Sequence, residues 1–337
     1  MNIKLSIILP VYNVEKYIGE CLDSLYNQDI PETEYEVICV NDCSPDTCRE
    51  IMLARQHYHK NLILIDHEQN KGLGEARNTG LSKARGKYVW FIDSDDYIEK
   101  NCFQKLISEI EENQLEILNF NFYRLKDSSI EEYELNLNTE TKTQKGTEFL
   151  IYLGKDYWKN ASASRKIYKR DYLLSIKLRF PSYPFMEDQT FALRALLYSK
   201  RFKHIPSKFY YYRWNESSLL QGELTPAKRL AIFALFSDLF SVYREIKDNQ
   251  PQLAEHIKEK AVYHFNNIFK SYLYFNHKDR KRAKSYILQN IDLIQENVNN
   301  KGWRKLLLKH LNTSVFFLFF TYPLLTLARD LKRSFFK

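Results

Sequence analysis

Cysteine is scarce in this chain, and its distribution limits the possible chemistry. The five cysteines among 337 residues all lie in the first third (Cys21, Cys39, Cys43, Cys48 and Cys102). No Cys-x-x-Cys pair occurs, and Cys43 and Cys48 lack the second pair of ligands that a zinc site needs. We therefore expect reduced, mostly structural thiols in a cytosolic protein.

Long apolar runs and internal repeats are also absent from most of the chain. The apolar run near the N-terminus covers only Leu5 to Leu9 and stops at Pro10, with no small-residue cleavage site after it. This segment is predicted to be a first strand rather than a signal peptide. No glycine lies between Gly222 and Gly302, and the pattern from Pro226 to about Leu311 is helical throughout.

Most of the sequence carries little net charge, although the formal net charge of the whole chain is +8. Residues 301–337 hold eight basic residues and one acidic residue, a net of +7. The remainder is close to neutral, without the basic face and interleaved aromatics that nucleic-acid binding needs. We therefore expect no nucleic-acid partner.

What the first 125 residues do contain is a regular alternation of strand and helix patterns. Short β-branched runs are separated by helical stretches, and these runs occupy 4–9, 35–40, 62–65, 88–92 and 116–123. This order predicts an α/β fold with a mostly parallel sheet and helices on both faces. Residues 126–146 are polar and acidic, and we expect an exposed excursion or hairpin there. Further on, 188–200 is predicted to be a helix and 209–214 a strand.

Polar residues follow four of the predicted strands. The segments are "PVYN" (10–13), "NDCSPD" (41–46), "DHEQNKGLG" (66–74) and "DSDD" (93–96). Ligands of parallel α/β sheets bind beyond the carboxyl ends of the strands. Four polar segments at one edge predict an extended polar ligand that contacts several strand ends.

The segment at 93–96 places Asp93, Asp95 and Asp96 within four positions after an apolar strand. Crowded carboxylates raise one another's pKa unless a cation lies among them. In extended chain Asp93 and Asp95 project to the same side, and magnesium or manganese suits a carboxylate plus phosphate oxygens. The alternatives are a helix cap, an aspartyl phosphatase and a receiver-type phosphoacceptor. The position after the fourth strand disfavours the phosphatase, and the length of the chain disfavours the receiver.

Four blocks of sequence resemble family 2 glycosyltransferases of the GT-A fold. They are "SIILPVYNVEKYIGECLDSL", "VICVNDCSPD", "NKGLGEARNTGLSKARGKYVWFIDSDD" and "FMEDQTFALRA". Their order and spacing are those of the family, and the resemblance covers roughly residues 4–215. It implies an inverting, nucleotide-sugar-dependent enzyme of the hexosyltransferase class.

The resemblance implies roles for residues at the first, second and fourth strand ends. Pro10, Val11 and Tyr12 would border the nucleotide base. Asp42 would accept a hydrogen bond from the uracil ring, and Asp93 would hold the ribose.

The same resemblance implies that Asp95 binds the Mn²⁺ or Mg²⁺ ion that bridges the donor diphosphate. Asn70, Gly72, Arg77 and Asn78 match a block that borders donor and metal. Gly72, with Gly74 beside it, would permit close backbone approach. For Arg77 the alternative is an ordinary residue on a helix surface.

A second pair of acids, Glu187 and Asp188, stands just ahead of the predicted helix. Either they cap this helix or one of them takes the proton of an attacking hydroxyl. In the family this pair carries the base, and we expect Asp188 to be the base and Glu187 to orient it. The basic side chains of Lys166, Arg213 or both are expected to face the diphosphate or the acceptor.

The predicted organisation has three parts: a GT-A catalytic domain at 1–220, a helical region at 221–312 and an apolar, basic tail at 313–337. Ser314 to Ala328 is fifteen residues without a charge, interrupted by Pro323. A helix of that length reaches about 22 Å, short of a hydrocarbon core of about 30 Å. A transmembrane span is thus disfavoured against a packed helix or an amphipathic segment on an anionic membrane surface.

The leading functional hypothesis is transfer of a sugar from a UDP-sugar to a hydroxyl of a glycan or lipid-linked oligosaccharide. The resemblance places this reaction in bacterial surface polysaccharide synthesis. The alternative is a non-catalytic nucleotide-sugar or glycan binding protein. We expect a cytoplasmic protein, with a peripheral location at the inner membrane if the tail binds lipid.

Overall fold

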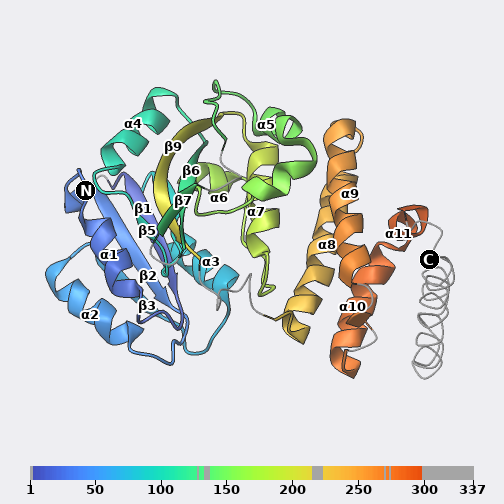
Figure 1. Ribbon diagram of the computed structural model, residues 1–337, viewed down its shortest axis with the longest axis horizontal. Helices are drawn as coiled ribbons and strands as arrows, with labels where there is room; N and C mark the ends of the chain where they lie inside the picture. The colour runs from blue at the N-terminus through green and yellow to red at the C-terminus, as the bar shows by residue number, and fades with distance from the viewer. Residues whose placement is uncertain are drawn as a thin grey trace. The chain divides into compact units, whose positions relative to one another are not determined.

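The structure is a computed structural model that describes residues 3–126, 129–132, 137–214, 223–268, 271–272 and 275–297 (Figure 1). The chain divides into two compact units, Met1–Glu223 and Leu224–Lys337, which are taken separately here. The predicted tail at 313–337 lies outside the described residues.

The strands of the first unit form one mixed sheet. Its order is β3-β2-β1-β4-β8-β6-β9-β5, and β7 pairs with β6 off this path. The strands are β1 Leu5–Val11, β2 Tyr35–Asn41, β3 Leu62–Asp66, β4 Tyr88–Phe91, β5 Tyr97–Ile98, β6 Ile117–Lys126, β7 Ser129–Glu132, β8 Lys166–Lys169 and β9 Phe202–Arg213.

The first half of the sheet is parallel, as predicted, and the second half contains both antiparallel and parallel pairs. Strands β3, β2, β1 and β4 run parallel, whereas β8 is antiparallel to both β4 and β6. Strand β8 lies between β4 and β6 in the sheet although it follows both of them in the chain. An α/β fold is thus confirmed, with a sheet that is mixed rather than parallel throughout.

Helices cover both faces of this sheet (Figure 1). They are α1 Ile18–Tyr26, α2 Cys48–Tyr58, α3 Leu73–Lys83, α4 Phe103–Glu112, α5 Gly146–Leu153, α6 Arg170–Ser175 and α7 Glu187–Tyr198. Two short 3₁₀ helices, η1 Glu32–Glu34 and η2 Gly154–Asn160, complete the connections.

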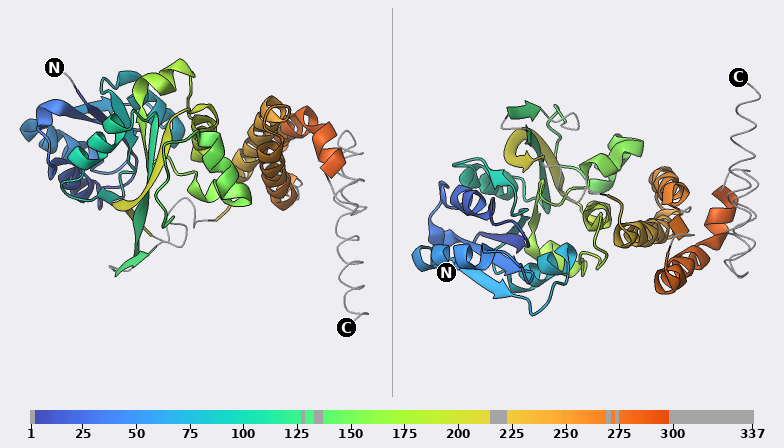
Figure 2. Two further views of the ribbon diagram at one scale, coloured as in Figure 1. Left: turned by 90° about the horizontal axis from the view of Figure 1, so that it is seen from above. Right: turned by 60° about the horizontal axis from the view of Figure 1, so that its bottom comes forward.

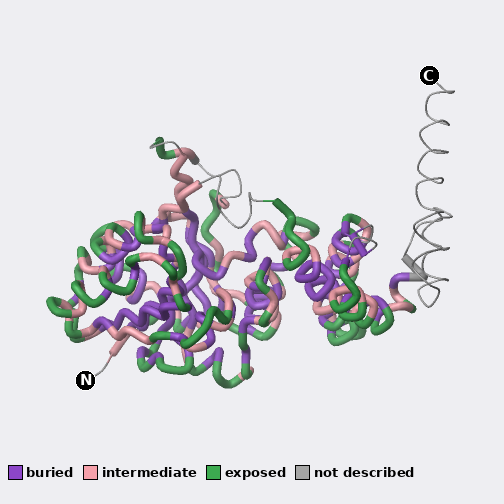
Figure 3. Tube along the Cα trace, turned by 90° about the horizontal axis from the view of Figure 1, so that it is seen from below, coloured by how far each residue is buried: buried purple, intermediate pink, exposed green. Residues whose placement is uncertain are grey.

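One face of the sheet holds the main apolar core, because alternate residues of each strand point to it. Leu5, Ile7 and Leu9 of β1 are fully buried there with Leu22 of α1 and Leu106 of α4. In Figure 3 the buried tube follows these central strands, while exposed segments lie around them.

The opposite face packs against α3 and the segment leading into α7. A Cβ at Gly80 of α3 would lie 2.3 Å from Cγ2 of Ile8, so only glycine lets this helix approach β1 so closely. Phe91 of β4 packs edge-on against Phe180 and Phe191, whose rings stack with centroids 3.7 Å apart. This packing holds α3 and the start of α7 next to the carboxyl end of β4.

Part of the polar stretch at 126–146 is a β-hairpin. Strand β7 pairs antiparallel with the end of β6, from Tyr123 opposite Glu132 to Lys126 opposite Ser129. This hairpin projects from the first unit in both views of Figure 2. The predicted excursion is therefore present in the described residues.

The second unit is helical where the structure describes it. Its helices are α8 Pro226–Ile246, α9 Pro251–Ile268, α10 His277–Gln289 and α11 Ile291–Asn297. Phe233 and Phe236 of α8 contribute to its aromatic interior, with Phe265 of α9 and Phe275 beside them. Among the helices of the described residues, none is both long enough and apolar enough to span a membrane.

Candidate active site

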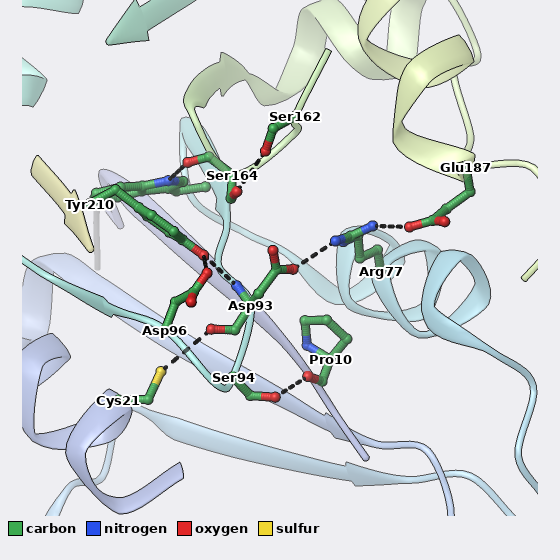
Figure 4. A network of polar contacts seen from close by, with 11 residues as sticks. Pro10, Cys21, Arg77, Asp93, Ser94, Asp96, Ser162, Ser164, Glu187 and Tyr210 are labelled. Carbon is green, nitrogen blue, oxygen red and sulfur yellow. Dashed lines mark hydrogen bonds and ion pairs between the residues drawn. The ribbon is translucent and has the colours of Figure 1, made fainter. Parts of the chain in front are cut away.

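The carboxyl ends of β1, β2, β3 and β4 come together at one edge of the sheet, as the strand order requires. A turn follows β4, and its Ser94 Oγ donates to the carbonyl oxygen of Pro10 at the end of β1 over 2.7 Å (Figure 4). The backbone N–H of Asp42 donates to the carbonyl of Val11 over 2.9 Å. Polar segments from three strands are thus joined directly.

The three carboxylates after β4 lie in a tight turn and not in an extended segment. The N–H of Asp96 donates to the carbonyl of Asp93 over 3.0 Å, which closes the turn. The expected same-side projection of Asp93 and Asp95 from an extended chain is therefore wrong, because β4 ends at Phe91. Proximity of the two carboxylates comes from the turn instead.

Each carboxylate of the turn has a different environment. Asp96 is buried and accepts a hydrogen bond from the Tyr210 hydroxyl over 2.6 Å (Figure 4). It also accepts one from the Arg213 N–H over 2.7 Å. Asp93 is partly exposed and pairs with Arg77 over 2.7 Å. The carboxylate of Asp95 interacts favourably with its own backbone N–H and, at longer range, with the charges of Arg213 and Arg77.

These environments raise the pKa of two of the acids. Burial and the neighbouring Asp93 charge raise the pKa of Asp95 to about 6. Burial, followed by the charges of Asp95 and Asp93, raises the pKa of Asp96 well above its usual range. A divalent cation beside Asp95 would relieve this repulsion, so the donor set fits a hard cation such as Mn²⁺ or Mg²⁺. Within the described residues no three His, Cys, Asp or Glu side chains form a metal cluster, so a bound ion would take most ligands from elsewhere.

Arg77 of α3 is buried and joins the two predicted acidic pairs. Its Nη2 lies 2.7 Å from Oδ1 of Asp93, and its Nη1 lies 2.6 Å from Oε1 of Glu187 (Figure 4). Only 4% of its side chain is exposed, so the alternative of a helix-surface residue is wrong. The guanidinium also lies over the ring of Phe180. Arg77 therefore fixes the start of α7 against the turn after β4.

Helix α7 begins at Glu187, and the residue at its N-cap position is Met186. Asp188 is therefore not the N-cap residue itself, and both acids lie in the first turn of the helix. Met186 has a φ of 60°, in the left-handed region that costs non-glycine residues energy. This conformation turns the chain sharply where the two acids enter the helix.

Asp188 has the electrostatics of a group that can exchange a proton near neutral pH. Burial, followed by the charge of Glu187, raises its pKa to about 7. The positive charges of Arg77 and Lys166 oppose this increase. Acids and bases with pKa values near the working pH are the most effective proton-transfer groups.

Asn78 and Gly74 bind neighbouring protein segments, although they lie in the block predicted to border the donor. The Asn78 amide nitrogen donates to the carbonyl of Phe180 over 2.9 Å, and its oxygen accepts from the Phe180 N–H over 2.9 Å. A Cβ at Gly74 would lie 2.5 Å from the carbonyl oxygen of Pro181. Asn70 is exposed, and Gly72 has a φ of 89°. Within this block, Asn70 and Gly72 lie on the loop before α3, whereas the side chain of Asn78 is hydrogen-bonded to the backbone of Phe180.

The residues predicted to contact the base lie at the ends of β1 and β2. Pro10 and Val11 are buried, whereas Tyr12 is 49% exposed. Asp42 is buried and accepts hydrogen bonds from the N–H groups of Lys71 over 2.8 Å and Gly72 over 2.7 Å. The loop at 67–72 is thereby attached to the end of β2.

The two basic residues that were expected to face a ligand, Lys166 and Arg213, lie in different environments. Lys166 is fully buried, and its ammonium donates to the carbonyls of Asn160 over 2.5 Å and Ser162 over 3.0 Å. The expectation that Lys166 faces a ligand is therefore wrong, since the lysine holds the loop before β8. Arg213 pairs with Glu20 over 2.5 Å and lies over the ring of Tyr97.

Two residues of this region were not predicted. Tyr210 donates to Asp96 and accepts from the Asp93 N–H over 3.1 Å, and it lies in a run of three tyrosines that predicts only a strand. His67 contacts Asp42 and is a single histidine in a polar loop. Neither residue type stands out in the sequence, since both roles depend on pairing between distant segments.

A sequence comparison identifies the family of this chain. The family model described as "Glycosyl transferase family 2" matches residues 6–174. The chain belongs to this family. Its mixed sheet, with helices on both faces and a helical region after it, is the GT-A-like fold of the relatives with solved structures.

Named relatives support the assignment. The "Uncharacterized glycosyltransferase EpsJ" of Bacillus subtilis (strain 168) is 36% identical over 66% of this chain and 64% of its own length. The "Poly(ribitol-phosphate) beta-N-acetylglucosaminyltransferase TarS" of Staphylococcus aureus (strain MW2) is 32% identical over 62% of this chain and 35% of its own. The chain thus spans less than two thirds of the length of these relatives.

A solved structure resembles the fold over most of the chain. The crystal structure of S. aureus TarS 1-349 in complex with UDP-GlcNAc has a TM-score of 0.67 and 25% identity. The match covers 87% of this chain and 82% of that chain.

Proposed function

We propose that this protein is a metal-dependent, inverting glycosyltransferase that moves a sugar from a UDP-sugar to a hydroxyl of a glycan or lipid-linked oligosaccharide. The observation that carries this proposal is the buried Arg77, which holds Asp93 and Glu187 together. One arginine thereby sets the spacing between the predicted donor acids and the predicted base. By analogy with its relatives, the reaction belongs to surface polysaccharide synthesis in bacteria.

Uridine diphosphate is the proposed nucleotide of the donor. TarS, a relative of similar fold, was crystallised with UDP-GlcNAc. In this chain Asp42 would accept a hydrogen bond from the uracil, Pro10, Val11 and Tyr12 would border the ring, and Asp93 would hold the ribose.

Asp95 is the proposed ligand of Mn²⁺ or Mg²⁺, and the diphosphate of the donor would supply further oxygens. When bound, such an ion stabilises the negative charge that develops on a leaving diphosphate. Asp95 supplies a carboxylate with few protein partners, beside a second carboxylate that raises its pKa. Arg213, fixed by Glu20 and by stacking on Tyr97, is the proposed basic group at the rim of this site.

Asp188 is the proposed general base. It would accept the proton of the acceptor hydroxyl as that oxygen attacks the anomeric carbon of the sugar. A single in-line displacement of this kind inverts the anomeric configuration and needs no covalent intermediate. Glu187 is held by Arg77, so its own role is to fix the start of α7 and orient Asp188.

The proposed location is the cytoplasm, with peripheral attachment to the anionic face of the inner membrane. Helix α10 supports the attachment, since it holds five basic residues and one acidic residue, a net of +4. Lys278, Lys281 and Arg282 are exposed at helical spacing and so share one side of α10. Anionic lipid attracts each such cation by about 1 kcal/mol near the surface.

The test is metal-dependent turnover of a panel of UDP-sugars by the unmodified chain and by Asp188→Asn. We expect UDP release and sugar transfer from the unmodified chain with manganese. Asp188→Asn should lose transfer by about a hundredfold or more, as for removal of a general base. It should keep its affinity for UDP in calorimetry. Equal absence of turnover in both proteins, with UDP still bound, would favour the non-catalytic binding alternative.

A further inference from the structure

His67 forms a buried hydrogen-bonded bridge between Asp42 and helix α3. Its Nδ1 lies 2.7 Å from Oδ1 of Asp42, and its Nε2 lies 2.9 Å from Oγ1 of Thr79. The side chains of His67 and Asp42 are each only 4% exposed. Hydrogen bonds in such surroundings are stronger than those in water, so the imidazole and the carboxylate are fixed relative to each other.

The bridge fixes the protonation pattern of the imidazole. A carboxylate oxygen only accepts hydrogen bonds, so Nδ1 must carry a proton. In the neutral imidazole Nε2 then accepts from the hydroxyl of Thr79. The carboxylate orientation is thereby tied to a residue of α3, the helix that also carries Arg77.

The hydrogen bonds of Asp42 are unequally distributed over its two oxygens. Oδ1 accepts from His67 Nδ1 and from the Lys71 N–H, which uses both of its lone pairs. Oδ2 accepts from the Gly72 N–H and retains one lone pair. The carboxylate therefore has a single remaining acceptor position, on a defined oxygen.

We propose that His67 is the positioning residue through which this site selects uracil over cytosine in the nucleotide donor. The inference rests on the proposed function, in which Asp42 contacts the base. Uracil offers an N3–H to the free lone pair of Oδ2, whereas cytosine presents an acceptor at N3. In the same position, cytosine would set the lone pair of its N3 against that of Oδ2. With His67 on Oδ1, the carboxylate cannot rotate to accept from the neighbouring cytosine amino group instead.

Two substitutions of His67 separate its two hydrogen bonds. The amide nitrogen of asparagine occupies nearly the position of Nδ1, so His67→Asn retains a donor for Asp42. The amide of glutamine reaches nearly the position of Nε2, so His67→Gln retains the contact with Thr79 and loses that donor. Both replace the same buried ring by an amide, and each is the control for the packing effect of the other.

The readout is the ratio of the dissociation constants of CDP and UDP, measured by calorimetry with manganese. We expect His67→Gln to lower the preference for UDP by about tenfold, the scale of one hydrogen bond to a charged group. His67→Asn should retain most of this preference at a similar Tm. Equal preference in both variants and in the unmodified chain would overturn the proposal.

Two further measurements distinguish failure of this proposal from failure of the proposed donor site. Asp42→Asn should abolish the preference for UDP. If it does not, the assignment of Asp42 to the base fails, and the proposed donor site fails with it. If His67→Gln does not fold, nitrogen NMR of the imidazoles in the unmodified chain decides, because the proposal requires His67 protonated at Nδ1 with and without UDP. A neutral ring protonated only at Nε2 would overturn it.

Discussion

Arg77 and Glu187 stand 110 positions apart in the chain and form a buried ion pair, with 2.6 Å between Nη1 and Oε1. The second terminal nitrogen of the same guanidinium, Nη2, binds Asp93. One side chain of α3 therefore carries positive charge to the predicted donor acids and to the start of α7.

The first prediction concerns loss of this arginine. Arg77→Met leaves the buried Glu187 carboxylate without its partner, which we expect to cost about 3 kcal/mol of unfolding free energy. Arg77 also lowers the pKa of Asp188, so its removal should move the pH dependence of transfer to higher pH. Denaturant titration measures the first effect, and a pH series of kcat/KM measures the second.

Arg77→Lys is the matched control. A lysine keeps the charge but not the fork that binds two carboxylates at once. We expect the pH dependence of this variant to stay near that of the unmodified chain, while part of the stability is lost. If Arg77→Met left both quantities unchanged, the guanidinium would have no role in joining the two acidic pairs.

The second prediction concerns the metal. Asp95→Asn removes one of the three carboxylates of the turn, so repulsion within the turn decreases and the metal-free protein should keep its Tm or gain slightly. Manganese binding in the presence of UDP, measured by calorimetry, should become too weak to detect, and transfer should be lost almost completely. Asp96→Asn should reduce transfer less. Substantial manganese-dependent transfer by Asp95→Asn would rule out this residue as the ligand.

The sequence predicted the parallel half of the sheet because its strands alternate with periodic helices, each within about 30 residues of the next. It did not predict β8 between β4 and β6, since short strands such as Lys166–Lys169 have no periodicity of their own. The same limit applies to the site. The acids were recognisable as clusters, whereas Arg77, Tyr210 and His67 acquire their partners only by folding.

Lys166 shows why residue type alone misleads. A lysine next to an arginine in a basic block favours a solvent-facing or ligand-facing group, yet burial here lowers its pKa well below the usual range. Its three acceptors lie within six positions in the chain. Only the conformation of the loop at 160–162 decides between the two environments.

The third prediction concerns the pH dependence of transfer. A general base acts in its ionised form, and Asp188 has a pKa raised to about 7. Transfer should therefore fall as the pH decreases through about 7, and reach a plateau above it. The measurement is kcat/KM against pH at saturating manganese, which reports groups of the free enzyme. A profile that stays flat through this region would exclude Asp188 as the base.

The fourth prediction concerns α10 and the membrane. The exposed side chains of Lys278, Lys281 and Arg282 take part in no ion pair within the described part of the chain, so their charge is available to a partner. Reversal of all three to glutamate should abolish sedimentation with phosphatidylglycerol vesicles at low salt, because attraction to the surface becomes repulsion. Turnover of a soluble UDP-sugar should be unchanged.

The control for this experiment carries the same change in net charge on the first unit. Lys100, Lys142 and Lys145 are exposed there, and their reversal to glutamate should leave vesicle binding largely intact. Truncation after Asn312 tests the contribution of the apolar tail separately. If both triple variants lose vesicle binding equally, the attraction depends on net charge and not on α10. If neither loses it, while the truncated chain does, the tail alone attaches the protein to lipid.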